Sequence, residues 1–475
     1  MAFSRLFGTP VDWGLASEPA AGFAGRRLMM PRGKMLGGSS GMNAMIYIRG
    51  HRLDYDGWVA AGCAGWGYDD VLPWFLRAEN QSRGASDYHG VDGPLRVTDL
   101  SRLQPLTEAF LAAAEDARFP SNPDFNGPSQ EGFGPYQVTQ YRDRRWSAAD
   151  AYLKPVMRRP NLVVRTGAEV RRVLFEGSRA IGVEYRRNGR LSSVRARRAT
   201  VLAAGAIASP HLLLLSGVGP AAELESLEIP VVLDLPGVGR NLQDHPVVPV
   251  GFHTRGVETL RRARSPISIA RYFLGRGGPL ASNVAEAGGF LRTRSELPAP
   301  DLQFHFAPTV FKEHRMLNEA EGFTLGVTLV APRSRGRLSL VSRQPEHAPA
   351  IEVGQLTEQP DVDVLIEGVR IARQLAARGP LGRFVAREYQ PGADVDTPPA
   401  VEDFIRSAAE LLYHPVGTCK MGVDSEAVVD PSLRVHGLEG LRVVDASVMP
   451  VIVRGNTHAP TVMIAERASE LIENG

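Results

Sequence analysis

The sequence is poor in several features that would place it in a special class. Only two of its 475 residues are cysteines, Cys63 and Cys419, so no disulfide framework is indicated and a reducing, cytoplasmic location is predicted. No run of about 18 apolar residues occurs, so no transmembrane segment is expected, and the start lacks the apolar core of a signal peptide. The 54 basic and 52 acidic residues give a net charge of +2, which supports neither a nucleic-acid partner nor a membrane-surface role.

A second absence is a phosphate-binding fingerprint near the start of the chain. The G-x-G-x-x-G turn that binds dinucleotides stands between a strand and a helix, and no such unit occurs there. Residues 217–222 match this spacing only superficially. They follow a leucine run typical of a helix, and Pro220 removes one of the N–H groups that would bind phosphate. We therefore expect no nicotinamide site of that type.

What is present indicates a mixed α/β protein with more than one domain. A chain of 475 residues exceeds the size of about 250–300 residues at which single cores stop growing. Short alternating runs separated by glycine turns predict strands at 162–165, 172–175, 181–185, 193–197 and 200–204, and further strands at 302–306, 323–331 and 336–341. Helical periodicity is found at 106–117, 211–216, 361–377 and 461–472.

Two histidines are notable because each lies in a loop beside proline and glycine. His414 belongs to Tyr-His-Pro-Val-Gly (413–417), and His458 belongs to Gly-Asn-Thr-His-Ala-Pro (455–460). Catalytic groups are often placed on loops held by a rigid scaffold. We interpret the pair as candidate catalytic residues; the alternative is that each imidazole only satisfies a local hydrogen bond. They are too far apart in the chain for a local metal-ligand pair, and no metal site is expected.

Two further segments allow a ligand to approach the backbone closely. Residues 37–41 are Gly-Gly-Ser-Ser-Gly, and such small side chains leave the backbone accessible. Apolar and aromatic residues follow at 45–48, whereas a linker would stay polar. The second segment is the predicted strand 200–204, which runs into Gly205 and a helix. A helix start after a glycine turn is typical of an anion site, because free N–H groups and the helix dipole favour negative charge.

Four motifs resemble the glucose–methanol–choline (GMC) family of flavoprotein oxidoreductases and occur in the family's order. They are segments 32–58, 205–220 and 236–245, and the pair His414 and His458 with Val-Asp-Ala-Ser (444–447) between them. The resemblance implies a mixed α/β fold. An FAD-binding Rossmann-like domain would comprise residues 1–50, 160–245 and 437–475, a connecting or lid segment residues 51–159, and an antiparallel-sheet substrate-binding domain residues 246–436. Segments 281–290 and 302–306 are most similar to choline dehydrogenases.

The resemblance also implies which residues bind FAD. These are Gly37, Gly38, Ser39, Met42, Asn43, Ala44, Val170, Ala204, Gly205, Asp445, Ala446, His458 and Ala459. Met42 stands where some members carry a histidine that is attached to the flavin, so non-covalent FAD is expected. The backbone of Val170 would meet the adenine, and Asp445 and Ala446 would lie near the ribityl chain and phosphates. The helix starting at His458 would face flavin N1 and O2.

The reaction implied is oxidation of a primary alcohol to an aldehyde. A neutral imidazole with a pKa near 6.5 suits a general base at neutral pH. We assign His414 as the base that removes the hydroxyl proton while the carbon gives hydride to flavin N5, and His458 as the group that hydrogen-bonds the substrate oxygen. Either histidine could take the proton. The identity of the alcohol, and whether O2 or a quinone accepts the electrons, stay open.

One departure from the family pattern concerns the start of the chain. Members normally begin with a strand, a G-x-G-x-x-G turn and a helix, and this sequence has none of them. We expect an FAD domain that is incomplete at its N-terminus, with an exposed apolar edge near 201–204. The alternative function is a truncated, flavin-poor remnant without activity. Light-driven fatty-acid decarboxylation, another chemistry in the family, is disfavoured by His458.

Overall fold

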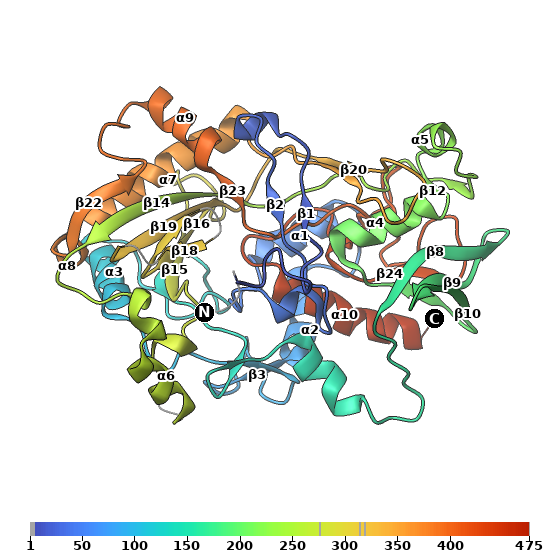
Figure 1. Cartoon of the computed structure of the whole chain (residues 1–475), viewed down its shortest axis with the longest axis horizontal. Coiled ribbons are helices and arrows are strands. Elements are labelled where there is room, and N and C mark those ends of the chain that lie inside the picture. The colour runs from blue at the N-terminus through green and yellow to red at the C-terminus, as the bar shows by residue number, and fades with distance from the viewer. Residues whose placement is uncertain (1–4, 275–276, 313–314, 318–319, 475) are drawn as a thin grey trace.

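The fold joins one large antiparallel sheet to a region in which distant parts of the chain meet. The computed structural model describes residues 5–274, 277–312, 315–317 and 320–474. Figure 1 shows the large sheet and its helices on one side of the molecule and a small three-stranded sheet on the other, with the last helix, α10 (His458–Glu473), between them. Among the described residues no helix has both the length and the apolar character needed to cross a membrane.

The large sheet has seven strands, and its neighbours pair antiparallel. In spatial order they are β22 (Val385–Gln390), β14 (Pro246–Thr254), β19 (Gly322–Leu329), β16 (Leu302–Ala307), β15 (Ala287–Leu291) and β5 (Gly132–Pro135), and β23 (Glu410–Leu411) also pairs with β14. Strand β5 comes from segment 51–159. That segment therefore contributes an edge strand to the sheet expected within 246–436.

Helix α7 (Gln359–Ala377) covers this sheet and packs on β19. Its apolar face, including Val362, Leu365 and Val369, is buried. A Cβ added at Gly368 would lie 2.3 Å from Val327 of β19, so the missing side chain lets the helix backbone approach the strand closely. The 3.6-residue period of this segment thus produces the face that closes the core of this region.

The second region brings the middle of the chain against its end. Strand β11 (Thr200–Leu202) pairs in parallel with β24 (Leu441–Val443), and helix α4 (Gly205–Leu215) follows β11 directly. Within the described part of the chain β11 has no other strand neighbour. Val201 is 41% exposed, which is the exposed apolar edge expected at 201–204.

The remaining elements are short or lie around these two regions. The small three-stranded sheet is an antiparallel meander of β8 (Ala168–Glu176), β9 (Arg179–Arg187) and β10 (Arg190–Arg195). Paired short strands are β1 (Leu15–Ala16) with β2 (Met29–Met30), β3 (Glu79–Gln81) with β4 (Leu95–Val97), β6 (Gln140–Tyr141) with β7 (Arg144–Arg145), β12 (Val218–Gly219) with β13 (Leu233–Asp234), β17 (Val310–Lys312) with β18 (Arg315–Leu317), and β20 (Arg337–Ser339) with β21 (Ala350–Glu352). The other helices are α1 (Arg52–Ala60), α2 (Tyr68–Ala78), α3 (Pro105–Asp116), α5 (Ala221–Ser226), α6 (Pro266–Phe273), α8 (Gly379–Gly382) and α9 (Pro398–Ala408).

One predicted strand is wrong. Residues 162–165 form no strand; Val163 is exposed, and the Arg165 guanidinium donates to the Tyr185 hydroxyl. The alternation there has no neighbouring strand to pair with, and pairing rather than alternation makes a strand. The helix was predicted to begin after Pro210, at residue 211. In the structure α4 begins at Gly205 and contains Pro210.

Candidate active site

His414 is held by the dipeptide Asp244-His245, which immediately precedes β14. A single carboxylate oxygen of Asp244 accepts the backbone N–H groups of both His245 and His414, each at 2.8 Å. The two imidazoles meet at right angles, with 3.0 Å between their Nδ1 atoms. Because one buried carboxylate fixes both backbones, the contact between the rings is set by the fold and not by flexible side chains.

The other ring nitrogen of His414 faces an amide network that fixes its tautomer. The Tyr136 hydroxyl donates to the Phe304 carbonyl at 2.6 Å, so its oxygen accepts the Gln303 amide group at 3.1 Å. The same Gln303 nitrogen donates to Asn456 Oδ1 at 3.3 Å. Asn456 Nδ2 therefore points at His414 Nε2, 3.3 Å away. Neutral His414 then carries its proton on Nδ1 and donates it to His245, while the lone pair of Nε2 accepts the Asn456 amide hydrogen.

The electrostatics of this cluster keep its imidazoles neutral. Burial lowers the pKa of His414 well below its usual value, and His245 and His305 lower it further. Burial also lowers the pKa of His245 to about 3 and that of His305 to about 3. The same burial raises the pKa of Asp244 to about 7, against the opposing effect of the nearby Arg32 guanidinium. His414 is half-buried, so a base that is neutral at neutral pH is still accessible.

His458 lies at the start of α10 and is tied electrostatically to the glycine segment. Burial lowers its pKa to about 4, and the charge of Arg145 contributes. Arg145 donates to the Ser40 carbonyl at 3.0 Å and to the side-chain and backbone oxygens of Asn43, each at 2.6 Å. His458 Nε2 is buried without a hydrogen-bond partner among the described residues. Arg145 thus brings the candidate residues at 37–44 and the start of α10 into one neighbourhood.

The segment 37–44 is a tight turn that requires glycine. Gly37 has a φ of 86°, and a Cβ there would lie 3.0 Å from the Ala149 backbone nitrogen. Ser40 closes the turn by donating to the Gly37 carbonyl at 2.5 Å and accepting the Ala148 N–H. Ser39 is half-buried, Met42 is buried, and the Ala44 carbonyl accepts an Asn283 amide hydrogen at 3.1 Å.

A second group of candidate residues is joined by Asp445. Its carboxylate accepts the Gly205 N–H at 2.9 Å and the Ser209 hydroxyl at 2.5 Å, and caps the turn that begins at Ala446. Ala204 therefore lies beside Asp445, although the two are distant in the chain. The parallel pairing of β11 with β24 produces this contact, because their carboxyl ends meet at one edge.

The candidate residues do not form a single compact cluster, as two of them show. Val170 lies in β8, half-buried and paired with Tyr185 of β9, and makes none of the contacts described above. The imidazoles of His414 and His458, both in the described part of the chain, do not hydrogen-bond each other; Asn456 lies beside His414 instead. Their joint contact with one substrate oxygen stays a prediction.

Sequence reasoning missed four residues of this neighbourhood: His245, Gln303, Asn456 and Arg145. His245 lies in the motif at 236–245 and Asn456 in the loop of His458, but neither was assigned a role. Gln303 alternates with the buried Phe304 in β16, and a polar residue in a buried strand is a signal that could have been read. Nothing local marks Arg145.

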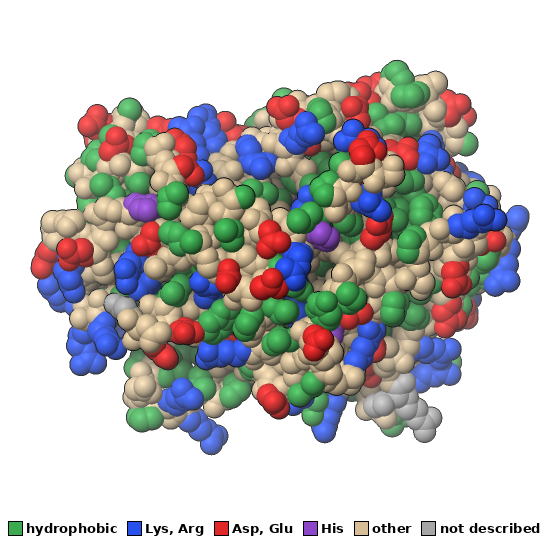
Figure 2. Space-filling view, turned by 180° about the vertical axis from the view of Figure 1, so that it is seen from behind, with side chains coloured by type: hydrophobic (Ala, Val, Ile, Leu, Met, Phe, Trp, Pro, Cys, Tyr) green, Lys and Arg blue, Asp and Glu red, His purple; other side chains and the backbone are tan. Residues whose placement is uncertain are grey.

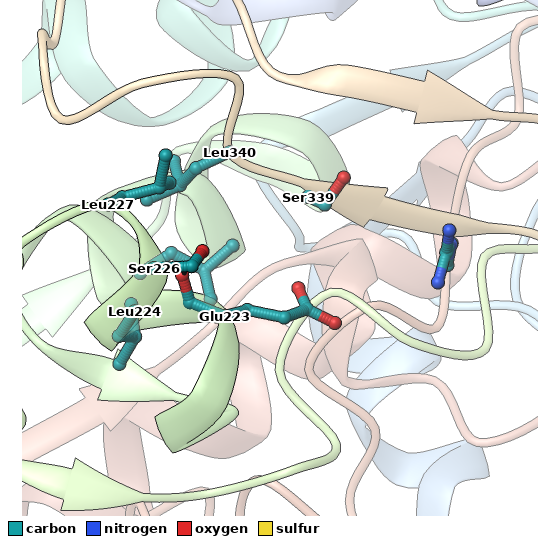
Figure 3. Close-up of a pocket in the computed structure, with 8 residues that line it drawn as sticks. Glu223, Leu224, Ser226, Leu227, Ser339 and Leu340 are labelled. Carbon is teal, nitrogen blue, oxygen red and sulfur yellow. Dashed lines mark hydrogen bonds between the residues drawn. The ribbon is translucent and has the colours of Figure 1, made fainter.

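One hollow of the described surface lies away from these residues. Its volume is about 310 Å³, and Figure 3 shows Glu223 of α5, Ser339 of β20, and Leu227 and Leu340, which follow these two elements, in its lining. None of the candidate residues lines it. No group of three or more His, Cys, Asp or Glu side chains in the described ranges could hold a metal ion.

Comparison with known proteins identifies the family. Models of the amino- and carboxyl-terminal parts of GMC oxidoreductases match residues 15–247 and 332–465. The chain belongs to the GMC oxidoreductase family. The predicted family and mixed α/β fold are thereby confirmed. This GMC protein is an FAD-dependent oxidoreductase that acts on CH–OH donors.

Named relatives cover nearly all of the chain. An alcohol dehydrogenase [acceptor] from Pseudomonas putida is 44% identical over 97% of this chain and 85% of its own length. An oxygen-dependent choline dehydrogenase from Brucella ovis is 42% identical over 97% of this chain and 85% of its own length. The solved structure of pyridoxine 4-oxidase from Mesorbium loti superposes with a TM-score of 0.91 at 31% identity, covering 100% of this chain and 91% of that one.

The candidate residues of this GMC protein fit a flavin nucleotide. At Gly38 and Gly205, with φ of 53° and 85°, a Cβ would meet no atom within 4 Å, so the backbone is open to a ligand at both turns. No side chain caps the first turn of α10, and the unpartnered Nε2 of His458 lies there. Free helix N–H groups stabilise negative charge, which suits phosphates and a reduced flavin.

Proposed function

We propose that the protein oxidises primary alcohols to aldehydes and that His414 is the base. Bound FAD would supply the acceptor for the hydride that leaves the alcohol carbon. The observation that carries this proposal is the placement of the His414 ring, with Nδ1 3.0 Å from His245 and Nε2 3.3 Å from the Asn456 amide nitrogen. The tautomer assigned from these contacts has its proton on Nδ1, and a substrate hydroxyl would replace Asn456 at Nε2. A neutral, positioned imidazole can remove the hydroxyl proton.

The other residues would position substrate and cofactor. His458 would donate a hydrogen bond to the substrate oxygen, where charge develops. Arg145 would keep segment 37–44 in shape by its bonds to Asn43 and Ser40. Met42 is buried, and its thioether offers no nucleophile for attachment to a flavin, which supports non-covalent FAD.

The charges around His414 favour a neutral alcohol over a cationic one such as choline. Its neighbours His245, His305 and Asn456 are neutral, and Arg32 is positive. The one carboxylate described there, Asp244, is occupied by two backbone N–H groups. A quaternary ammonium group would find no free carboxylate among these residues and would depend on aromatic rings such as Tyr136 alone.

The test is anaerobic mixing of the FAD-loaded protein with benzyl alcohol, an aliphatic primary alcohol and choline, followed by flavin absorbance. We expect both neutral alcohols to bleach the flavin faster than choline. Faster bleaching by choline would contradict the preference for neutral substrates. Retained flavin that no alcohol bleaches would contradict alcohol oxidation as a whole.

A second candidate is a flavin-poor protein without activity, favoured by the exposed edge at Val201. It predicts that the protein loses added FAD on desalting. Retention of flavin in a one-to-one ratio through gel filtration would rule it out.

A further inference from the structure

Helix α6 presents apolar side chains to solvent. Ile267, Phe273 and Leu274 are 67%, 75% and 69% exposed. At 3.6 residues per turn they share one continuous face with Ile269 and Ala270, both of which are exposed. Figure 1 shows α6 projecting at the lower edge of the molecule, away from α7 and α10. Single exposed apolar residues are common, but a contiguous apolar face marks an interaction site.

The opposite face of α6 is attached to the protein through polar groups. Ser268 is buried, and its hydroxyl donates to the Arg262 carbonyl at 3.2 Å. The Tyr272 hydroxyl donates to the Asp143 carbonyl at 3.3 Å. A surface helix normally turns its apolar face inward. Here that face points outward, so it is not used in the protein's own core.

Exposed arginines surround this face. Arg271 lies on α6 at the edge of the apolar face and has no ion-pair partner among the described residues. Arg142 and Arg144 are exposed on either side of Asp143, which accepts the Tyr272 hydroxyl. Between residues 255 and 274 the sequence has five arginines and one glutamate. Two of these arginines, Arg261 and Arg262, are partly neutralised by Glu258 and Glu321.

We infer that α6 docks the protein on the surface of an anionic lipid bilayer. The eight-residue helix is too short to span a membrane, but an apolar face flanked by arginines is suited to lying in the interface. Phe273, Leu274 and Ile267 would enter the acyl boundary, and Arg271 would contact lipid phosphates. Figure 2 shows basic and acidic side chains interspersed over one face of the molecule. This overall balance of charge conceals the local excess of arginine, which is why composition alone did not predict a membrane-surface role.

The test is flotation of the full-length, FAD-loaded protein with two kinds of vesicle. One contains phosphatidylglycerol with phosphatidylcholine, and the other contains phosphatidylcholine alone. We expect binding to the anionic vesicles and weaker binding to the neutral ones. The double substitution Phe273→Ser with Leu274→Ser should reduce binding about tenfold or more. Arg271→Glu should weaken binding to anionic vesicles only, as should added salt.

A matched control removes two exposed apolar side chains elsewhere. Leu191→Ser with Val194→Ser alters β10, where both side chains are exposed, and should leave vesicle binding unchanged. Retained flavin absorbance shows that each variant is folded. The inference is overturned if the parent protein does not float with anionic vesicles, or if the α6 variant floats as well as the parent. It is also overturned if the α6 variant changes only the molecular mass in light scattering, since the face would then join copies of the chain.

Discussion

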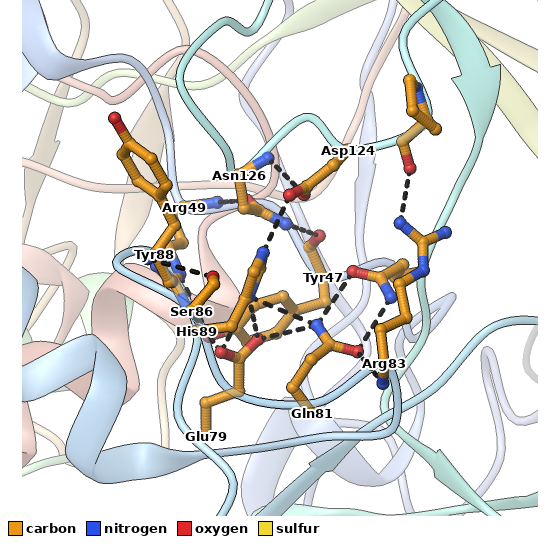
Figure 4. A network of polar contacts seen from close by, with 12 residues as sticks. Tyr47, Arg49, Glu79, Gln81, Arg83, Ser86, Tyr88, His89, Asp124 and Asn126 are labelled. Atoms are coloured by element: carbon orange, nitrogen blue, oxygen red, sulfur yellow. Dashed lines mark hydrogen bonds and ion pairs between the residues drawn. The ribbon is translucent and has the colours of Figure 1, made fainter.

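Protonated His89 should stabilise the fold up to a high pH. Figure 4 shows its ring between Glu79 and Asp124, with Nδ1 3.0 Å from one carboxylate and Nε2 2.8 Å from the other. Glu79 also pairs with buried Arg49 at 2.7 Å. Burial opposes the charge, but the hydrogen bonds to Asp124 and Glu79 outweigh it and raise the pKa of His89 to about 9. Asp124 also accepts the backbone N–H of Asn126, and the Asn126 side-chain oxygen accepts the backbone N–H of Arg49.

The magnitude follows from linkage. A folded-state pKa of about 9 against about 6.5 in the unfolded chain corresponds to about 3 kcal/mol. We reduce this to about 2 kcal/mol because solvent screens part of the interaction. The folded pKa is raised, so this stability is fully present below about pH 6.5 and is lost as the pH rises through about 9.

The assay is urea unfolding of the parent protein and of His89→Ala across this pH range. The variant should be less stable at low pH, and the difference in unfolding free energy should shrink by about 2 kcal/mol as the pH rises past the folded pKa. His347→Ala is the control, because His347 is exposed and should show no such trend. A difference that stays constant with pH would refute the charged His89.

Other predictions concern the candidate site. Gly37→Ala should lower FAD affinity and the thermal midpoint more than Gly177→Ala, since both glycines have positive φ but only the first lacks space for a Cβ; titration with FAD and thermal melting measure this. Arg145→Gln should weaken FAD binding about tenfold or more through loss of charged hydrogen bonds to Asn43, measured by flavin fluorescence. His245→Phe should slow flavin reduction about tenfold by removing the acceptor of the proposed base's N–H, and His245→Asn, whose amide oxygen can accept, should restore part of it. In the parent protein the rate should fall only below about pH 6.5, because the base has a lowered pKa and loses function when protonated; a rate that falls at higher pH contradicts this.

The sequence pattern predicted those elements whose structure depends on neighbouring residues in the chain. The Asn188-Gly189 pair, a typical hairpin turn, joins β9 to β10, and the periodicity of α7 gave its bounds to within two residues. What it could not predict depends on tertiary pairing. Strand β5 joins the large sheet from a distant segment, and His245 reaches His414 only because β14 and β23 are neighbours. The loop histidines and the glycine segments were singled out by their local sequence and their roles by resemblance, whereas their tautomers and neighbours required coordinates.

The central claim, that His414 removes the substrate proton, is tested by the rate of flavin reduction in anaerobic rapid mixing. FAD-loaded parent protein, His414→Ala and His458→Asn are mixed with the same primary alcohol after their flavin contents have been matched. We predict that His414→Ala lowers the rate about 10²-fold or more, as for a lost general base. His458→Asn should be milder, because an amide can still donate to the substrate oxygen. A larger loss in His458→Asn would reverse the two roles, and unchanged rates in both variants would contradict the account.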